Sequence, residues 1–278
     1  MGAITKEEFE AVCAYVYGLT GISLDNTKAY LVETRLGSLV KELGLSGYGA
    51  LLAKAKAEAA KHLEKKIIDA ITTNETLFFR DSAPFELLRE KILPEVAGRG
   101  KKSAPGKPPP IRIWSAACST GQEIYSIAIT AKEVLGVNGC DIRLIGSDIS
   151  EAAMNAAREA VYSKFEIDRG MPGHLVDKYF APRGHKWQLH PAVKSMAEFR
   201  KVNLMGPLEA MGKFDVIFCR NVAIYFSQAD KAKLFERLAK CLVKDGYLII
   251  GSTESLRGVC PAFELKMHGR AAYYQIKD

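Results

Sequence analysis

A glycine and two carboxylates in the second half of the chain have the types and spacing of a nucleoside-binding site. Gly121 lies in "SAACSTGQE", Glu123 follows it by two positions, and Asp148 ends the apolar run "DIRLIGSD". Small residues and a glycine let the backbone approach a ligand closely before a helix begins. A carboxylate at the end of the next strand, as Asp148 would be, can hold both hydroxyls of a ribose.

The glycine pattern distinguishes between two kinds of nucleoside ligand. Dinucleotide-binding turns carry G-x-G-x-x-G, whereas "ACSTGQEIY" has the single Gly121, followed by Glu123. Without a second glycine a pyrophosphate cannot approach closely, and a carboxylate would repel it. The carboxylate suits a cationic group instead, such as the amino group of S-adenosylmethionine (SAM). These residues favour a SAM-dependent methyltransferase over a nicotinamide dehydrogenase.

Each carboxylate also has a purely structural interpretation. An acid near a helix start, such as Glu123, often pairs only with the helix dipole. Asp148 could simply cap the helix that follows it. Because both carboxylates fall at successive strand ends, we favour nucleoside binding over these structural interpretations.

A second polar and aromatic cluster, "NETLFFRD" (74–81), combines an amide, a hydroxyl, two aromatic rings and a guanidinium. It is too polar for a core helix and too apolar for an ordinary loop. One interpretation is a helix N-terminus, with Asn74 as its cap and Arg80 in a surface ion pair.

The elements that position these residues alternate between apolar strands and helices. This order predicts an α/β fold with a doubly wound, mainly parallel sheet. In such sheets ligands bind outside the carboxyl ends of the strands, and the candidate polar residues fall at those ends. Strands are expected at 111–116, 141–148, 198–202, 214–219 and 246–252, helices at 122–135, 150–160 and 228–242, and a closing antiparallel hairpin at "AFELKMH" and "AAYYQIK".

The remaining segments define the domain organisation. Residues 1–71 read as an N-terminal all-helical domain, and 72–278 as the methyltransferase domain. Within the latter, the Pro-, Gly- and Lys-rich stretch 98–110 predicts a linker or loop, and the Gly-, Pro- and aromatic-rich stretch 162–193 predicts a small inserted β-subdomain. In the helical domain, we expect a capping box at Thr5 and Glu8, a helix from about Thr27 to Leu43 that stops at Gly44, and one alanine-rich helix over 48–71.

Composition limits the classes of partner. The formal net charge is +7, but 98–110 alone holds four basic residues and no acid. Such a charge on a flexible segment gives little support for a nucleic-acid groove, and we expect no nucleic-acid partner. The histidines lack metal-ligand spacing, so no metal is expected. The six cysteines read as reduced, mostly buried thiols. With no leader or membrane span in the sequence, we expect a soluble, cytoplasmic monomer without direct membrane insertion.

Five motifs together make the assignment more specific. "NETLFFRD", "WSAACSTGQEIYSIAI", "GSDIS", "NL" and "FCRNVAIYF" resemble, in order and approximate spacing, the chemotaxis receptor glutamate methyltransferases (CheR). The resemblance covers nearly the whole chain, including the helical domain, the inserted subdomain and the closing hairpin. It implies methyl transfer from SAM to glutamate side chains of membrane chemoreceptors, with S-adenosylhomocysteine as the product. The cytoplasmic domains of those receptors would be the partners.

The resemblance also implies roles for individual residues. "NETLFFRD" would be a lid-like segment whose polar residues face the cofactor while Phe78 and Phe79 anchor it. Arg80 and Tyr225 are candidates for placing the acceptor. In the helical domain, the family uses a basic face of the second helix on the acidic receptor surface; the matching helix here offers Lys28, Arg35 and Lys41, although a solvated face is the alternative. The implied cofactor residues are Asn74, Thr76 and Arg80 of the lid-like segment, Gly121, Glu123 for the methionine amino group, Asp148 for the ribose, Asn203 and Leu204 for the adenine, and Arg220 with Asn221 to complete the pocket.

Two other functions share parts of this pattern. A nucleic-acid base methyltransferase would have the same fold, but it usually carries an Asn/Asp-Pro-Pro-aromatic motif where this chain has "RNVAIYF" (220–226). A SAM-binding signalling module without catalysis is the second alternative, against which Arg80 and Tyr225 argue. Methylation of a carboxylate needs no general base, because a glutamate with a pKa of about 4.3 is ionised at neutral pH. The absence of histidine from every motif fits that reaction.

Overall fold

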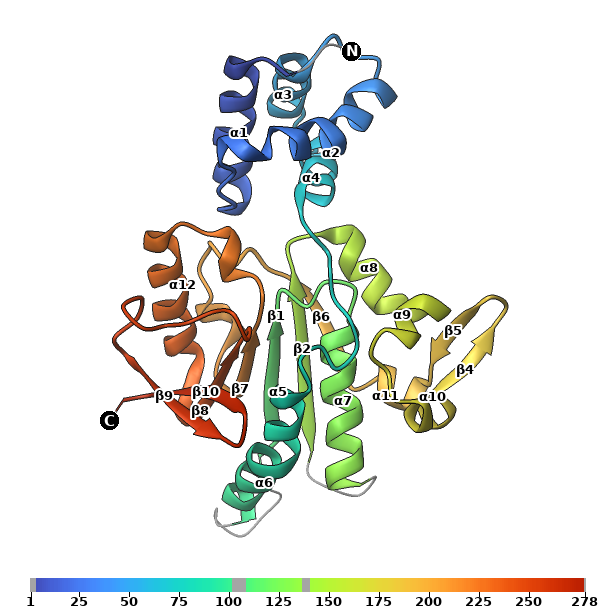
Figure 1. Ribbon diagram of the computed structural model, residues 1–278, viewed down its shortest axis with the longest axis vertical. Coiled ribbons are helices and arrows are strands. Elements are labelled where there is room, and N and C mark those ends of the chain that lie inside the picture. Colours follow the sequence, from blue (N-terminus) through green and yellow to red (C-terminus); the bar gives the residue numbers. More distant parts are fainter. Residues whose placement is uncertain (1–3, 102–108, 137–140, 278) are drawn as a thin grey trace.

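The chain forms a helical domain and a larger α/β domain. The helical domain lies over one end of the α/β domain, beyond the carboxyl ends of its central strands (Figure 1). The computed structural model describes residues 4–101, 109–136 and 141–277. No helix in this described part is long and apolar enough to cross a membrane.

The helical domain has its own apolar core, built only from residues of the first part of the chain. The predicted capping box is confirmed, because the Thr5 hydroxyl accepts from the Glu8 N–H and the Glu8 carboxylate accepts from the Thr5 N–H. The four α-helices around this core in the described residues are α1 (Lys6–Thr20), α2 (Ala29–Glu42), α3 (Tyr48–Ala57) and α4 (His62–Ile71).

The prediction of one helix over 48–71 is wrong. The chain breaks between α3 and α4, where Lys61 takes a left-handed conformation with φ 57°. The Glu58 carboxylate there accepts a hydrogen bond from the Leu63 N–H at 2.6 Å, which satisfies a free donor at the start of α4. The break lets the apolar faces of both helices contact α1, which a straight helix could not do. The second helix also begins later than expected, after a 3-10 turn at Asn26–Lys28.

The α/β domain confirms the predicted fold class. Its seven-stranded sheet has the order β6–β2–β1–β7–β8–β10–β9. The first five strands are parallel, and β10 is antiparallel to both of its neighbours as the closing hairpin requires. The strands are β1 (Ile111–Ala116), β2 (Ile142–Asp148), β6 (Ala197–Lys201), β7 (Phe214–Cys219), β8 (Leu242–Ile250), β9 (Phe263–His268) and β10 (Ala271–Ile276).

Both faces of this sheet are covered. Alternate residues of a strand point to opposite faces, so Val216 and Phe218 of β7 belong to one apolar core and Ile217 to the other. The first core is closed by α5 (Ser82–Leu87), the π-helical turn Leu88–Ile92, α6 (Leu93–Lys101) and α7 (Gln122–Leu135), and the second by α12 (Gln228–Cys241). A further helix, α8 (Glu151–Glu159), packs on β2 and β6.

The first part of the predicted linker 98–110 is helical instead. Helix α6 continues to Lys101 because its last turn packs against β8: the Arg99 guanidinium donates to the Asp245 carbonyl at 3.1 Å and lies over the Tyr247 ring. The stretch 102–108, with most of the predicted linker, lies outside the described residues.

The predicted insertion between α8 and β6 is confirmed, and it is helical as well as β. Its three-stranded antiparallel sheet has the order β3–β5–β4. The Phe78 ring packs edge-on against Tyr162 and Phe180 of this subdomain, which joins it to the lid-like segment. The elements are β3 (Val161–Ser163), α9 (Lys164–Asp168), α10 (Gly173–Tyr179), β4 (Phe180–Arg183), β5 (Lys186–Leu189) and α11 (Pro191–Lys194).

Candidate active site

A cavity of about 480 Å³ opens at the carboxyl ends of the central strands, where it also touches the helical domain. It lies where β1 has β2 on one side and β7 on the other, which is the position expected for a ligand in a doubly wound sheet. The predicted site residues that line it are Asn74, Thr76, Arg80, Glu123, Asp148, Asn203, Leu204, Arg220, Asn221 and Tyr225.

Asp148 is a buried carboxylate held by backbone donors. Its Oδ2 accepts from the Ser119 N–H and its Oδ1 from the Ser150 N–H, both at 2.9 Å. Burial raises the pKa of Asp148, an effect that these N–H groups partly offset. The cap of α8 is Ser150, not Asp148. Asp148 lines the cavity, and a carboxylate has about four acceptor sites, so it can also accept from ribose hydroxyls.

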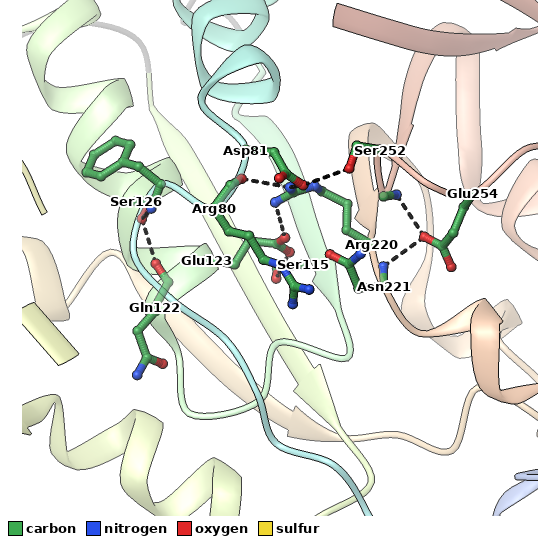
Figure 2. Close-up of polar contacts among 12 residues, drawn as sticks. Arg80, Asp81, Ser115, Gln122, Glu123, Ser126, Arg220, Asn221, Ser252 and Glu254 are labelled. Carbon is green, nitrogen blue, oxygen red and sulfur yellow. Dashed lines mark hydrogen bonds and ion pairs between the residues drawn. The ribbon is translucent and has the colours of Figure 1, made fainter. Parts of the chain in front are cut away.

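Glu123 is fixed through both of its oxygens. It is the second residue of α7, and its Oε1 accepts from the Ser115 hydroxyl at 2.7 Å. Its Oε2 pairs with Nη1 of Arg220 at 3.0 Å (Figure 2). Glu123 therefore has specific partners in addition to the helix dipole, and these contacts hold its carboxylate at the wall of the cavity.

Arg220 connects the end of β7 to the lid-like segment. Its side chain is almost fully buried, and its Nη2 donates to the Arg80 carbonyl at 2.7 Å and to Asp81 Oδ2 at 2.9 Å. One guanidinium therefore lies between the carboxylates of Asp81 and Glu123 (Figure 2). Asp81 also accepts from the Ser252 hydroxyl. Asp81 ends the motif "NETLFFRD", but no sequence pattern indicated a role for it.

The lid-like segment itself is not helical before Ser82, which contradicts the alternative of a helix N-terminus at Asn74. Phe78 is fully buried, and Phe79 packs edge-on against Phe85, so the predicted anchoring by the two rings is confirmed. Phe79 takes φ 49°, and its N–H donates to the Ser126 hydroxyl at 3.0 Å.

The polar residues of the segment line the cavity. The Asn74 carbonyl accepts from the Ser119 hydroxyl at 3.0 Å, and the Arg80 guanidinium donates to the Glu75 carbonyl at 3.2 Å. The Arg80 side chain thus lines the cavity while its guanidinium stabilises the backbone of its own segment.

Asn203 and Tyr225 contact the helical domain. The Asn203 side-chain amide donates to the Leu19 carbonyl at 2.9 Å, and its Oδ1 accepts from the Met205 N–H at 2.9 Å. The Tyr225 carbonyl accepts from the Ser23 N–H at 2.9 Å. Two residues expected to touch cofactor and acceptor therefore also join the domains. The sequence contains no signal for this, because it depends on how the domains dock.

Gly121 does not belong to the residues that line the cavity. It takes φ 95°, and a Cβ there would lie 3.0 Å from the Ala157 Cβ and 3.1 Å from the Tyr162 hydroxyl. The absence of a side chain thus serves the turn and the packing of α7. A direct part for Gly121 in binding stays a prediction.

The helical domain supplies one wall of the cavity, which the sequence analysis did not anticipate. Lys28 and Arg35, two of the three basic residues proposed for receptor docking, line it together with Leu24, Asp25 and Leu31. None of the residues that line this cavity is a histidine or a cysteine.

Comparison with known families shows which kind of methyltransferase this chain is. The family model for the CheR methyltransferase all-alpha domain matches residues 7–72, and that for the CheR methyltransferase SAM binding domain matches residues 74–270. The chain belongs to the CheR methyltransferase family. SAM is therefore its cofactor, and the buried Asp148, the anchored Glu123 and the size of the cavity fit it.

Curated relatives align along nearly the full length of this CheR methyltransferase. It is 36% identical over 275 residues to chemotaxis protein methyltransferase Cher2 of Pseudomonas putida, with 97% of this chain and 98% of that protein covered. It is 37% identical over 278 residues to chemotaxis protein methyltransferase 1 of Vibrio cholerae, with 99% and 98% covered. A third, chemotaxis protein methyltransferase 1 of Pseudomonas aeruginosa, is 34% identical, with 97% and 98% covered. The family thus connects this chain with SAM-dependent methylation in chemotaxis.

Proposed function

We propose that this CheR methyltransferase converts glutamate side chains in the cytoplasmic domains of chemoreceptors into methyl esters, with S-adenosylhomocysteine as the second product. The observation that carries the proposal is a cavity whose lining includes Arg80 and Tyr225 but no histidine or cysteine. Arg80 and Tyr225 can bind and orient an anionic acceptor. An ionised carboxylate is the acceptor that needs this treatment, because it is already a nucleophile at neutral pH.

The residues that would hold the cofactor come from four strand ends and the lid-like segment. Bound SAM supplies a methyl group on a sulfonium, from which a carboxylate oxygen can displace the thioether. Glu123 would bind its ammonium group, and Asp148 would accept from both ribose hydroxyls. The other proposed contacts are Asn74, Thr76 and Arg80 from the lid-like segment, Asn203 and Leu204 at the adenine, and Arg220 and Asn221 at the end of β7.

Arg80 and Tyr225 are the proposed acceptor residues. The guanidinium can bind a carboxylate bidentately, and the phenol can donate to one oxygen and fix its direction. Holding the acceptor within reach of the methyl group would contribute most of the rate enhancement. Neutralisation of charge during transfer is favoured further where water is excluded, as at the buried Asp148 and Arg220.

The experiment that tests this function uses methyl-labelled SAM and membranes that contain a chemoreceptor, followed by mild alkali. Label released as volatile methanol would support a carboxyl methyl ester. A receptor with its acceptor glutamates changed to alanine is the matched control and should release none. Alkali-stable label would contradict the proposal in favour of nitrogen or carbon methylation. Measurable SAM binding without any label would indicate a non-catalytic module.

A further inference from the structure

Glu254 lies in the loop after β8, outside every motif that the sequence analysis identified. Its Oε2 accepts hydrogen bonds from two backbone N–H groups, those of Asn221 and Gly251, each at 2.7 Å. Figure 2 shows this carboxylate reaching across from its loop to the turn that follows β7. It thereby connects the ends of two neighbouring strands at the active site.

The turn that Glu254 holds has a left-handed backbone. Asn221 takes φ 56°, in a region that asparagine enters more readily than most other residues with a side chain. On one side of it stands Arg220, whose guanidinium pairs with Glu123. On the other side is the 3-10 turn Ala223–Tyr225. The conformation of Asn221 therefore sets the direction in which both neighbours enter the cavity.

Gly251 is fitted to the same turn. A Cβ at this position would lie 2.7 Å from the Asn221 Nδ2, 2.7 Å from the Glu254 Oε2 and 3.0 Å from the Asn221 backbone nitrogen. Such distances require a glycine, because the end of β8 approaches the turn too closely for any side chain. Gly251 and Glu254 are thus both arranged around one N–H group of the active-site turn.

The second oxygen of Glu254 indicates that this arrangement has an energetic cost. Its Oε1 is buried and has no hydrogen-bond partner in the described part of the chain. A buried polar atom without a partner destabilises the folded state. Proteins tolerate such costs mainly at functional sites.

We propose that Glu254 is a positioning residue for methyl transfer. Its carboxylate holds the left-handed turn at Asn221, and through that turn it fixes Arg220 beside the cofactor and Tyr225 beside the acceptor. The effect on chemistry is indirect, because Glu254 is not among the residues that line the cavity. This inference rests on the proposed function.

The test compares three variants in the methanol-release assay. Glu254→Ala removes both hydrogen bonds and should lower kcat roughly 10- to 100-fold, the loss typical of a misplaced catalytic geometry. KM for SAM should change less, by about threefold or under, because Asp148 keeps its donors Ser119 and Ser150 and Glu123 keeps its donor Ser115. Glu254→Gln keeps an acceptor oxygen at the same reach and should recover most of kcat. Glu236→Ala, an exposed glutamate on α12, is the matched control and should match the wild type.

Amide hydrogen exchange separates this inference from the proposed function. The Asn221 and Gly251 amides should exchange faster in Glu254→Ala than in the wild type, and at near wild-type rates in Glu254→Gln, with no acceptor present. If the wild-type protein esterified no receptor, the proposed function would fail while the exchange data still reported on the turn. An unchanged kcat in Glu254→Ala, or an equal loss in Glu254→Gln, would overturn the positioning role.

A second pair of variants guards against a folding failure. If Glu254→Ala did not fold, Glu254→Asp, whose shorter side chain cannot span the same distance, would be compared with Glu254→Gln. The aspartate should lose kcat and the glutamine should keep it. If Glu254→Asp and Glu254→Gln both kept the wild-type kcat, the inference would also be overturned.

Discussion

Arg220 and Arg80, two of the three arginines that line the cavity, differ in their partners. Arg220 is buried between the carboxylates of Glu123 and Asp81, and its charge is neutralised by the protein. In the described part of the chain, the Arg80 guanidinium donates to the neutral Glu75 carbonyl and pairs with no carboxylate. A positive charge without a carboxylate partner beside the cavity is what an anionic acceptor needs.

We therefore expect Arg80→Ala to lower kcat roughly 100-fold or more, the scale found when a key electrostatic donor is removed. Tyr225→Phe removes one hydroxyl and should cost about tenfold. Both are measured by methanol release at saturating SAM. The control is Arg89→Ala, which removes an exposed arginine paired with Glu90. A fully active Arg80→Ala protein would refute the assignment of the acceptor site.

Because the pKa of Asp148 is raised, we expect a change of pH to affect SAM affinity and the stability of the folded state in opposite directions. Burial raises the pKa of Asp148 above that of an exposed aspartate, so on acidification it takes up a proton earlier. In the ligand-free protein this group favours the folded state at low pH and loses that contribution as the pH rises through its pKa. Ribose hydroxyls donate to the ionised form, so SAM affinity should instead fall as the pH is lowered.

Calorimetric titration with SAM between pH 7.5 and 5 measures this effect. Asp148→Ala should weaken binding by about 1.5–3 kcal/mol, the range for hydrogen bonds to a charged group, and should flatten the pH dependence. Asp177→Ala, on the exposed side of α10, should leave both unchanged. Equal affinities for Asp148→Ala and the wild type would exclude the ribose role.

The lid-like segment depends on its buried phenylalanine. Phe78 packs edge-on against the rings of both Tyr162 and Phe180, and it also belongs to the first core of the sheet. It therefore joins the lid-like segment to the inserted subdomain and to that core. Phe78→Ala should lower the free energy of unfolding by about 3–5 kcal/mol in urea titrations. The variant should also bind SAM more weakly, because Asn74 and Thr76 lose their support. Phe165→Ala removes a ring that is 67% exposed and should cost less than about 0.5 kcal/mol.

The bounds of helices and strands can be predicted from the sequence where a local residue pattern determines them. Strands β1, β2 and β7 are mainly apolar runs, and their bounds, like those of α12, agree with the expected ranges to within a few residues. The helix over 48–71 was wrong because a side chain, Glu58, caps α4 across the break. The part played by Asp81 and Glu254 could not be predicted, because each contacts backbone or side chains far away in the sequence.

The two domains are joined by hydrogen bonds that end next to cofactor residues. Asp69 on α4 accepts from the Ser150 hydroxyl at 2.8 Å, and the Ser150 N–H donates to Asp148. On the other side, the Tyr17 hydroxyl donates to Asp230 of α12 at 2.8 Å. We therefore expect the position of the helical domain to affect the proposed ribose site, which no motif in either half of the sequence could reveal.

Asp69→Ala should weaken SAM binding roughly twofold to tenfold, the equivalent of one ordinary hydrogen bond, although the substitution lies in the other domain. The like charge of Asp69 also raises the pKa of Asp148, so the loss of affinity on acidification should begin at a lower pH in the variant. Calorimetry checks both effects, with Glu10→Ala on the exposed face of α1 as the control. Wild-type affinity and pH profile in Asp69→Ala would show that the domains act independently.

The central place of β1 in the sheet has a consequence for synthesis on the ribosome. Its partners β2 and β7 follow later in the chain, and β7 begins only at Phe214. The core of the helical domain, in contrast, is complete by Ile71. We expect the helical domain to fold first, while the apolar strand Ile111–Ala116 waits for its second neighbour. Such delayed pairing of distant strands slows folding and leaves apolar edges exposed, so the nascent α/β half is where this protein would depend most on chaperones.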